Sequence, residues 1–160
     1  MKSSLTLPNK FKKVGWMILM PSLVVGIFSV AEKFELEWLN PTVFTIFHDE
    51  FMGEKSYFTF VKVNITNTLI GVFFIIGALL VGFSKEKKED EYISGIRLSS
   101  LLWAVAVNYI LLLFAFIFIY GSPFLDVMIY NMFTVLILFI ARFHYILYKN
   151  SKSVPDEKQY

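Results

Sequence analysis

Long apolar runs alternate with short polar segments along the 160-residue chain. The runs extend over about residues 14–31, 63–83, 98–120 and 123–148, and no Asp, Glu or Lys interrupts their interiors; Asp126 and Arg142 lie close to the two ends of the last run. A helix of about 20 apolar residues suffices to cross the hydrocarbon core of a bilayer. The pattern therefore predicts an all-α membrane protein, a four-transmembrane-helix bundle formed as one membrane domain over residues 1–160.

Composition supports this class, because 56% of the residues are hydrophobic and 18% are charged, and the charges are bunched between the runs. A secretory signal peptide is the alternative interpretation of the first run. That run is long for a signal peptide, and "SVAEK" at its end is a poor cleavage site.

Basic residues predict the orientation, because loops on the cytoplasmic side of a membrane carry an excess of Lys and Arg. They gather before the first run, between the second and third, and around the end of the fourth. We therefore expect both termini, the loop 84–97 and the tail 149–160 in the cytoplasm, and the loop 32–62 outside. In a bacterium, this places the protein in the inner membrane. The basic residues in question are Lys2, Lys10, Lys12, Lys13, Lys85, Lys87, Lys88, Arg97, Arg142, Lys149, Lys152 and Lys158.

The residue pattern of the loop 32–62 predicts a short amphipathic helix at the membrane surface. Asn40 fits the N-cap, Pro41 the first helical position and Gly53 the C-terminal cap. The flanking stretches "KFELEWL" and, more loosely, "YFTFVKVN" alternate as strands do. The helix would either place its apolar side chains among lipid headgroups or act as a lid or partner-binding element. Those side chains are Val43, Phe44, Ile46, Phe47 and Phe51.

Two asparagines lie at mirrored positions in the third and fourth runs, Asn108 in "NY" and Asn131 in "YN". The turn "GSP" at residues 121–123 makes these runs an antiparallel helical hairpin, with Ser122 as a cap and Pro123 at the first helical position. With a rise of about 1.5 Å per residue, positions equally far from the turn share a depth. We therefore expect the two amides to pair near the middle of the membrane.

Other polar residues fall on the same helical faces or near the ends of the runs. They serve either as packing contacts that fix the bundle or as a pathway for a ligand, proton or ion. A carboxylate near the middle of the membrane, which a proton-coupled carrier usually needs, is missing from the runs. The candidate intramembrane polar contacts are Asn108, Asn131, Asn64, Asn67 and Asp126. A cytoplasmic rim cluster is predicted from Arg97, Arg142 and His144.

Chemistry-bearing motifs are scarce. The chain has no cysteine and two histidines, and it lacks the nucleophile-elbow, zinc-protease, P-loop and dinucleotide-binding patterns. In "HDE" at residues 48–50, adjacent side chains of a helix point in different directions and cannot converge on one ion. We predict no catalytic, cofactor-binding or metal-ligating residue. Nothing resembles a nucleic-acid-binding element.

The stretches "EDEYISGIRLSSLLWAVAVNYILLLFAFIFIYG" and "NMFTVLILFIARFHYILYK" resemble small, uncharacterised bacterial four-helix integral membrane proteins. The resemblance covers about the last half of the chain and implies no activity. The sequence favours a non-enzymatic accessory, assembly or partner-binding subunit of a membrane complex. Its partners would be the bilayer and, through small-residue helix faces, other membrane proteins or a second copy. The alternative is a small transporter, channel or lipid or ligand sensor that uses the polar line.

Overall fold

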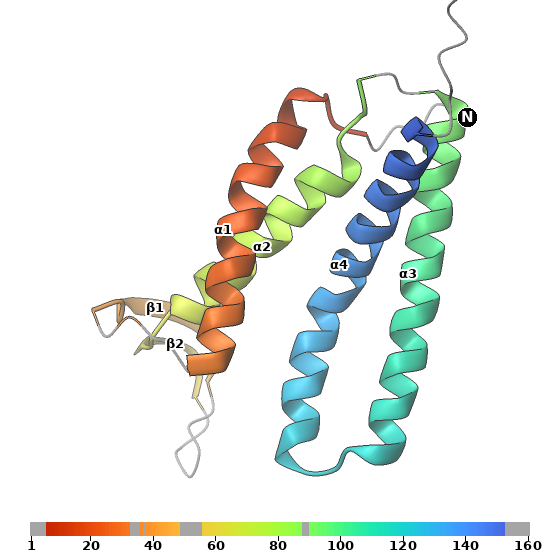
Figure 1. The fold of residues 1–160 in the computed structure, drawn as a ribbon. Helices are drawn as coiled ribbons and strands as arrows, with labels where there is room; N and C mark the ends of the chain where they lie inside the picture. The colour runs from red at the N-terminus through yellow and green to blue at the C-terminus, as the bar shows by residue number, and fades with distance from the viewer. Residues whose placement is uncertain (1–5, 33–35, 37, 49–55, 88–89, 153–160) are drawn as a thin grey trace, which may run out of the picture. The chain divides into compact units, whose positions relative to one another are not determined.

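The computed structural model describes residues 6–32, 36, 38–48, 56–87 and 90–152. These residues form four helices and one antiparallel pair of strands (Figure 1). All four helices are long and apolar enough to cross a membrane, which confirms the predicted helices at this level. In chain order the elements are α1 (Lys10–Glu32), β1 (Thr42–His48), β2 (Ser56–Lys62), α2 (Thr66–Phe83), α3 (Glu91–Phe118) and α4 (Ser122–Lys152).

The chain divides into two compact units. The first holds residues 1–19 and 75–160, and therefore the start of α1, the end of α2 and all of α3 and α4. The second holds residues 20–74, with the rest of α1, the strands and the start of α2.

Helices α3 and α4 of the first unit form the predicted antiparallel helical hairpin and lie side by side (Figure 1). The turn between them needs Gly121, whose φ of 77° lies in the left-handed region that glycine adopts without strain. Helix α3 begins at Glu91, seven residues before the predicted start at residue 98, because the side chain of Asp90 caps it by accepting a hydrogen bond from Ile93 N at 2.8 Å. Part of the predicted polar link 84–97 is therefore helical.

The core of the first unit is built from small residues and phenylalanines. Ala78, Val81 and Ala104 are fully buried, as are Phe139 and Phe143 of α4. Small residues let helix backbones approach one another closely, which is how helices associate where lipid surrounds them.

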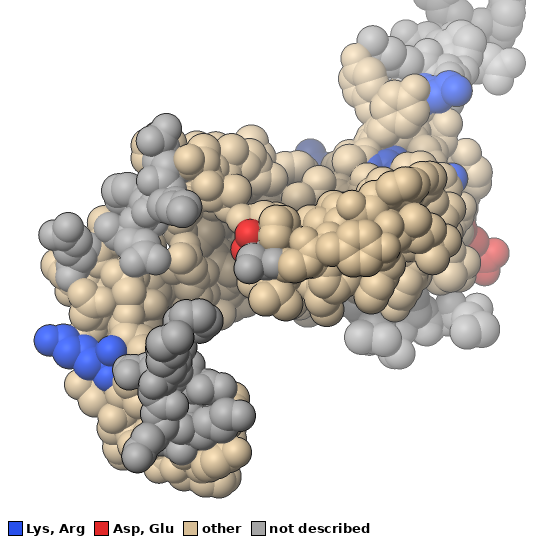
Figure 2. Space-filling model, turned by 90° about the horizontal axis from the view of Figure 1, so that it is seen from below, with Lys and Arg blue, Asp and Glu red and all other residues tan. Residues whose placement is uncertain are grey.

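The outward surface of the helical hairpin is apolar. Leu113 of α3 is 59% exposed and Phe118 is 71% exposed. Residues other than Lys, Arg, Asp and Glu make up nearly all of the described surface seen in Figure 2. Such a surface suits hydrocarbon better than water, in agreement with the length and composition of the helices.

The prediction of an amphipathic helix in the outer loop is wrong for residues 42–48, because these residues form strand β1. Residues 49–53 of the predicted helix lie outside the described part of the chain. The strands pair from Thr42 with Lys62 to His48 with Ser56. The segment "TVFTIF" consists of β-branched and aromatic residues, which favour strands, and "SYFTFVK" supplies a matching partner. The rings of Phe44 and Phe60 are opposed at 5.4 Å between centroids.

The expected strand in "YFTFVKVN" is confirmed by β2. Most of "KFELEWL" lies outside the described residues, and Leu36, Trp38 and Leu39 are not in a strand.

Candidate functional site

The amide pair predicted between α3 and α4 is present. Asn108 Nδ2 donates to Asn131 Oδ1 at 3.0 Å, and Asn131 Nδ2 donates to Asn108 Oδ1 at 3.1 Å. Asn108 is 3% exposed and Asn131 is half-buried. Each amide thus satisfies one donor and one acceptor of the other inside an apolar helical hairpin, where an unpaired amide would be costly.

Asn108 belongs to a buried face of α3 that the sequence predicts from helical spacing. Its members are spaced by four, four and seven residues, which places them on one side of a helix, and all of them are buried. They are Ser100, Ala104, Asn108 and Ala115.

The residues predicted as the rim cluster all meet aromatic rings. Arg97 is 7% exposed, donates from Nη2 to the carbonyl oxygen of Ser84 at 3.1 Å and lies over the ring of Phe143 at 5.2 Å. The guanidinium of Arg142 lies over the ring of Trp103 at 4.5 Å. Cation–π contacts of this kind stabilise a cation that is removed from water.

His144 is the third predicted member of this cluster. Its Nδ1 lies 2.9 Å from the carbonyl oxygen of Ile140, and its ring meets the edge of Trp16 at 5.4 Å between centroids. It also contacts the ring of Phe143, the same ring that Arg97 covers. The structure therefore brings Arg97 and His144 onto one phenylalanine.

Several buried polar atoms in this region have no hydrogen-bond partner among the described residues. Among them are Ser84 Oγ, Ser100 Oγ, Arg142 Nη1 and His144 Nε2. Ser84 and Ser100 are completely buried. Buried donors and acceptors usually have partners. Because these atoms have none among the described residues, each can form a further hydrogen bond.

The asparagines of the second unit hold its segments together. Asn67 Oδ1 accepts a hydrogen bond from Ser29 Oγ at 2.9 Å, which joins α2 to α1 within this unit. Asn64 precedes α2; its Nδ2 donates to Leu36 O at 2.9 Å, and its Oδ1 accepts from Thr66 N at 2.9 Å. Asp126 lies exposed in the second turn of α4, in the first unit.

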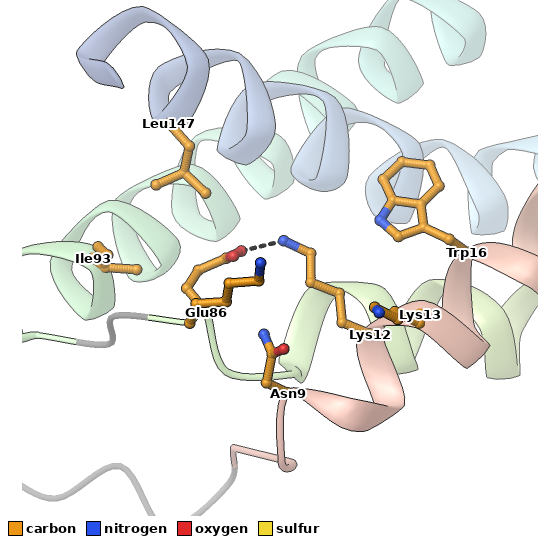
Figure 3. A pocket seen from close by; sticks show the side chains of 8 residues that line it. Asn9, Lys12, Lys13, Trp16, Glu86, Ile93 and Leu147 are labelled. Carbon is orange, nitrogen blue, oxygen red and sulfur yellow. Dashed lines mark hydrogen bonds and ion pairs between the residues drawn. The ribbon is translucent and has the colours of Figure 1, made fainter.

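The first unit also has a hollow of about 600 Å³. Lys12 forms an ion pair with Glu86 across it (Figure 3). In the sequence, Lys12 and Lys13 indicate only the orientation, and no spacing rule connects them with Glu86, which is distant in the chain. The hollow is lined by Asn9, Lys12, Lys13, Trp16, Glu86, Lys87, Ile93 and Leu147.

Within the described part of the chain, no three His, Cys, Asp or Glu side chains are grouped as metal ligands would be. The polar groups described above are amides, hydroxyls, lysines, ring-stacked arginines, one histidine and the carboxylate of Glu86. These groups can bind and orient an anion or fix helices against one another. The comparisons with known proteins found no matching protein-family model, no matching curated protein and no matching solved structure, so the resemblance to small bacterial four-helix membrane proteins stays a prediction.

Proposed function

We propose that this protein is a non-enzymatic integral membrane protein that serves as an accessory, assembly or partner-binding subunit of a membrane complex. In this proposal all four helices span the inner membrane of a bacterium, and both termini lie in the cytoplasm. The β-hairpin of β1 and β2 then lies on the outer side.

Charge at one end of the first unit supports this orientation. Lys12, Lys13, Lys85 and Lys87 gather where the start of α1 meets the link after α2. The end of α4 reaches the same place, because Leu147 lines the same hollow as Lys12, Lys13 and Lys87. The opposite end of the α3–α4 hairpin, residues 119–121, carries no charge. An excess of lysine on one side marks the cytoplasmic side of a membrane protein.

The observation that carries the accessory role is the reciprocal pair of Asn108 and Asn131. A pathway for a solute needs polar groups that face a hollow and can exchange partners. These amides instead use donor and acceptor groups on each other, and Asn67 likewise bonds to Ser29 of the same unit. Polar groups used in this way fix helices, which is the ordinary role of asparagine in packed membrane helices.

Two measurements test the proposal. The chain, extracted from its native membranes in a mild non-ionic detergent, should elute together with a second membrane protein at constant stoichiometry. Reconstituted alone into liposomes, it should not raise ion or solute leakage above that of empty liposomes. Recovery of the chain alone or with copies of itself would contradict the accessory role, and protein-dependent leakage would favour a channel or transporter.

A lipid or ligand sensor is the second candidate function, and the hollow beside Lys12 and Trp16 favours it. The hollow lies at the charged end of the first unit, away from the asparagine pair. A sensor would therefore use this end rather than the polar line predicted from the sequence.

A further inference from the structure

The hollow of the first unit combines two kinds of wall. Trp16 of α1, Ile93 of α3 and Leu147 of α4 supply apolar surface, as Figure 3 shows. Lys12 and Lys13 of α1 supply positive charge. A site lined in this way fits a molecule that has both an anionic and an apolar part.

The hollow is held in shape by contacts of the chain's N-terminal segment. Leu7 pairs with the end of α2, where Leu7 N donates to Phe83 O at 2.9 Å and Lys85 N donates to Leu7 O at 2.8 Å. Asn9 Nδ2 donates to Lys85 O at 2.6 Å. Because these bonds join the start of α1 to the link that carries Glu86 and Lys87, the charged wall is a built part of the fold.

The charge of the hollow is unbalanced. It is lined by Lys12, Lys13 and Lys87 against Glu86, so the formal sum is three positive charges and one negative, or +2. The first turn of α1 contains no acidic residue, although the N-terminus of a helix carries partial positive charge and favours anions. Lysines at this position add positive charge to the positive end of the helix dipole. A bound anion would compensate the charge of the lysines and the partial charge of the helix N-terminus.

We propose that this hollow binds the phosphate-bearing head of an anionic phospholipid from the leaflet that borders the charged end of the first unit. The phosphate is held by Lys13 and Lys87, which are exposed at the hollow, while the glycerol and upper acyl chain lie against Trp16 and Leu147. Basic pockets between membrane helices recognise anionic headgroups in this manner. The proposal does not depend on the accessory role.

A lipid accounts for both walls better than a soluble phosphate does. A free phosphate ion would use the lysines and leave the apolar wall of Trp16, Ile93 and Leu147 in contact with water. Helices α1 and α4 are apolar enough to cross a membrane, so lipid is at hand beside them.

The test uses Trp16 as the reporter. The tryptophans outside the hollow, Trp38 and Trp103, are replaced by phenylalanine, and the full chain is placed in phosphatidylcholine bilayers. Brominated phosphatidylglycerol is then added at low mole fraction, and its quenching of Trp16 fluorescence is compared with that by brominated phosphatidylcholine at the same fraction. Selective binding gives steeper quenching by phosphatidylglycerol.

A matched pair of double variants separates a site from diffuse surface charge. Lys13→Gln with Lys87→Gln removes two lysines that line the hollow. Lys10→Gln with Lys85→Gln removes two exposed lysines that are near Lys13 and Lys87 in the sequence but do not line the hollow. We expect the first pair to lower the preference for phosphatidylglycerol by about tenfold and the second pair to leave most of it, because lysine attracts anionic lipid over short distances.

Three outcomes would overturn the proposal. Equal quenching by the two brominated lipids would remove the site altogether. Equal loss in the two double variants would assign the preference to surface charge. Loss of the preference in excess soluble glycerol phosphate would show that the ligand is a soluble anion rather than a lipid. Circular dichroism of each variant verifies that the helices remain formed.

Discussion

The amide pair of Asn108 and Asn131 can be tested at the level of single residues. Asn108→Leu leaves the Asn131 amide without its partner in an apolar helical hairpin. We expect this variant to lose about 1–2 kcal/mol of unfolding free energy, since an unpaired buried amide loses its hydrogen bonds without regaining those of water. Unfolding in mixed detergent micelles, followed by circular dichroism, measures the change.

The double variant Asn108→Leu with Asn131→Leu is the control. It removes both amides together, so it should recover most of the lost stability, because replacing both partners by apolar groups is close to neutral. If each single variant were as stable as the parent chain, the pair would not act as a packing contact.

Ser100 offers the opposite prediction. Its hydroxyl is completely buried on α3 and has no hydrogen-bond partner among the described residues. Ser100→Ala should therefore leave stability unchanged or raise it by up to about 1 kcal/mol, because it removes a buried polar atom at almost constant volume. The same unfolding assay checks this, and a loss above about 1 kcal/mol would reveal that the hydroxyl is satisfied in the folded protein.

At this scale the sequence predicts contacts that follow from helical spacing and a short turn. Asn108 lies ten residues before the end of α3 at Phe118, and Asn131 lies nine residues after the start of α4 at Ser122. The two positions therefore fall at nearly the same depth in the hairpin, and their contact follows from the helical rise alone. The ion pair of Lys12 with Glu86 follows from no such rule, because it depends on how the N-terminal segment joins the end of α2.

At the scale of elements, the close approach of α1 to α2 within the first unit depends on glycine. A Cβ atom at Gly77 would lie 2.8 Å from Leu19 N, and one at Gly15 would lie 2.8 Å from Leu80 Cβ. Gly77→Ala should cost about 1–3 kcal/mol of unfolding free energy, because the obstacle is backbone, which cannot move aside as a side chain can.

Gly95 in α3 is the matched control for this substitution. A Cβ atom there would meet no heavy atom within 4 Å. Gly95→Ala should stabilise the protein by about 0.5–1 kcal/mol, because alanine is the better helix former. If the two variants changed stability equally, helix propensity rather than packing would explain the effect of Gly77.

The outer loop shows why local pattern alone does not decide between helix and strand. Apolar residues at positions 43, 44, 46 and 47 fit a helical face, and Asn40 with Pro41 fits a helix start. The same stretch also fits a strand, and residues 56–62 provide the partner on which Phe44 and Phe47 face Phe60 and Tyr57. Pairing between segments is not visible in the periodicity of either one.

At the scale of the whole molecule, the length of the apolar runs predicted the four described helices that are long and apolar enough to cross a membrane. Hydrocarbon admits few alternatives to a helix for a run of that length. The helix ends were less predictable. Helix α3 begins at Glu91 and α4 continues to Lys152, so both extend through polar residues that an apolar run does not include. The side chain of Asp90 caps α3 and accounts for its early start.

The proposed orientation leads to a labelling prediction, which the absence of cysteine makes clean. Single cysteines replace three exposed residues: Glu91 at the start of α3, Tyr57 in β2 and Leu113 within α3. In intact spheroplasts, a membrane-impermeant maleimide should label Tyr57→Cys and spare Glu91→Cys, because the proposal places these positions on opposite sides of the membrane.

After lysis, Glu91→Cys should be labelled as well, while Leu113→Cys should stay unlabelled because hydrocarbon surrounds it and excludes a charged reagent. Labelling of Glu91→Cys but not Tyr57→Cys in intact spheroplasts would reverse the orientation. Labelling of Leu113→Cys before lysis would instead place the middle of α3 in water, and the apolar surface of the helical hairpin would then need a protein partner to cover it.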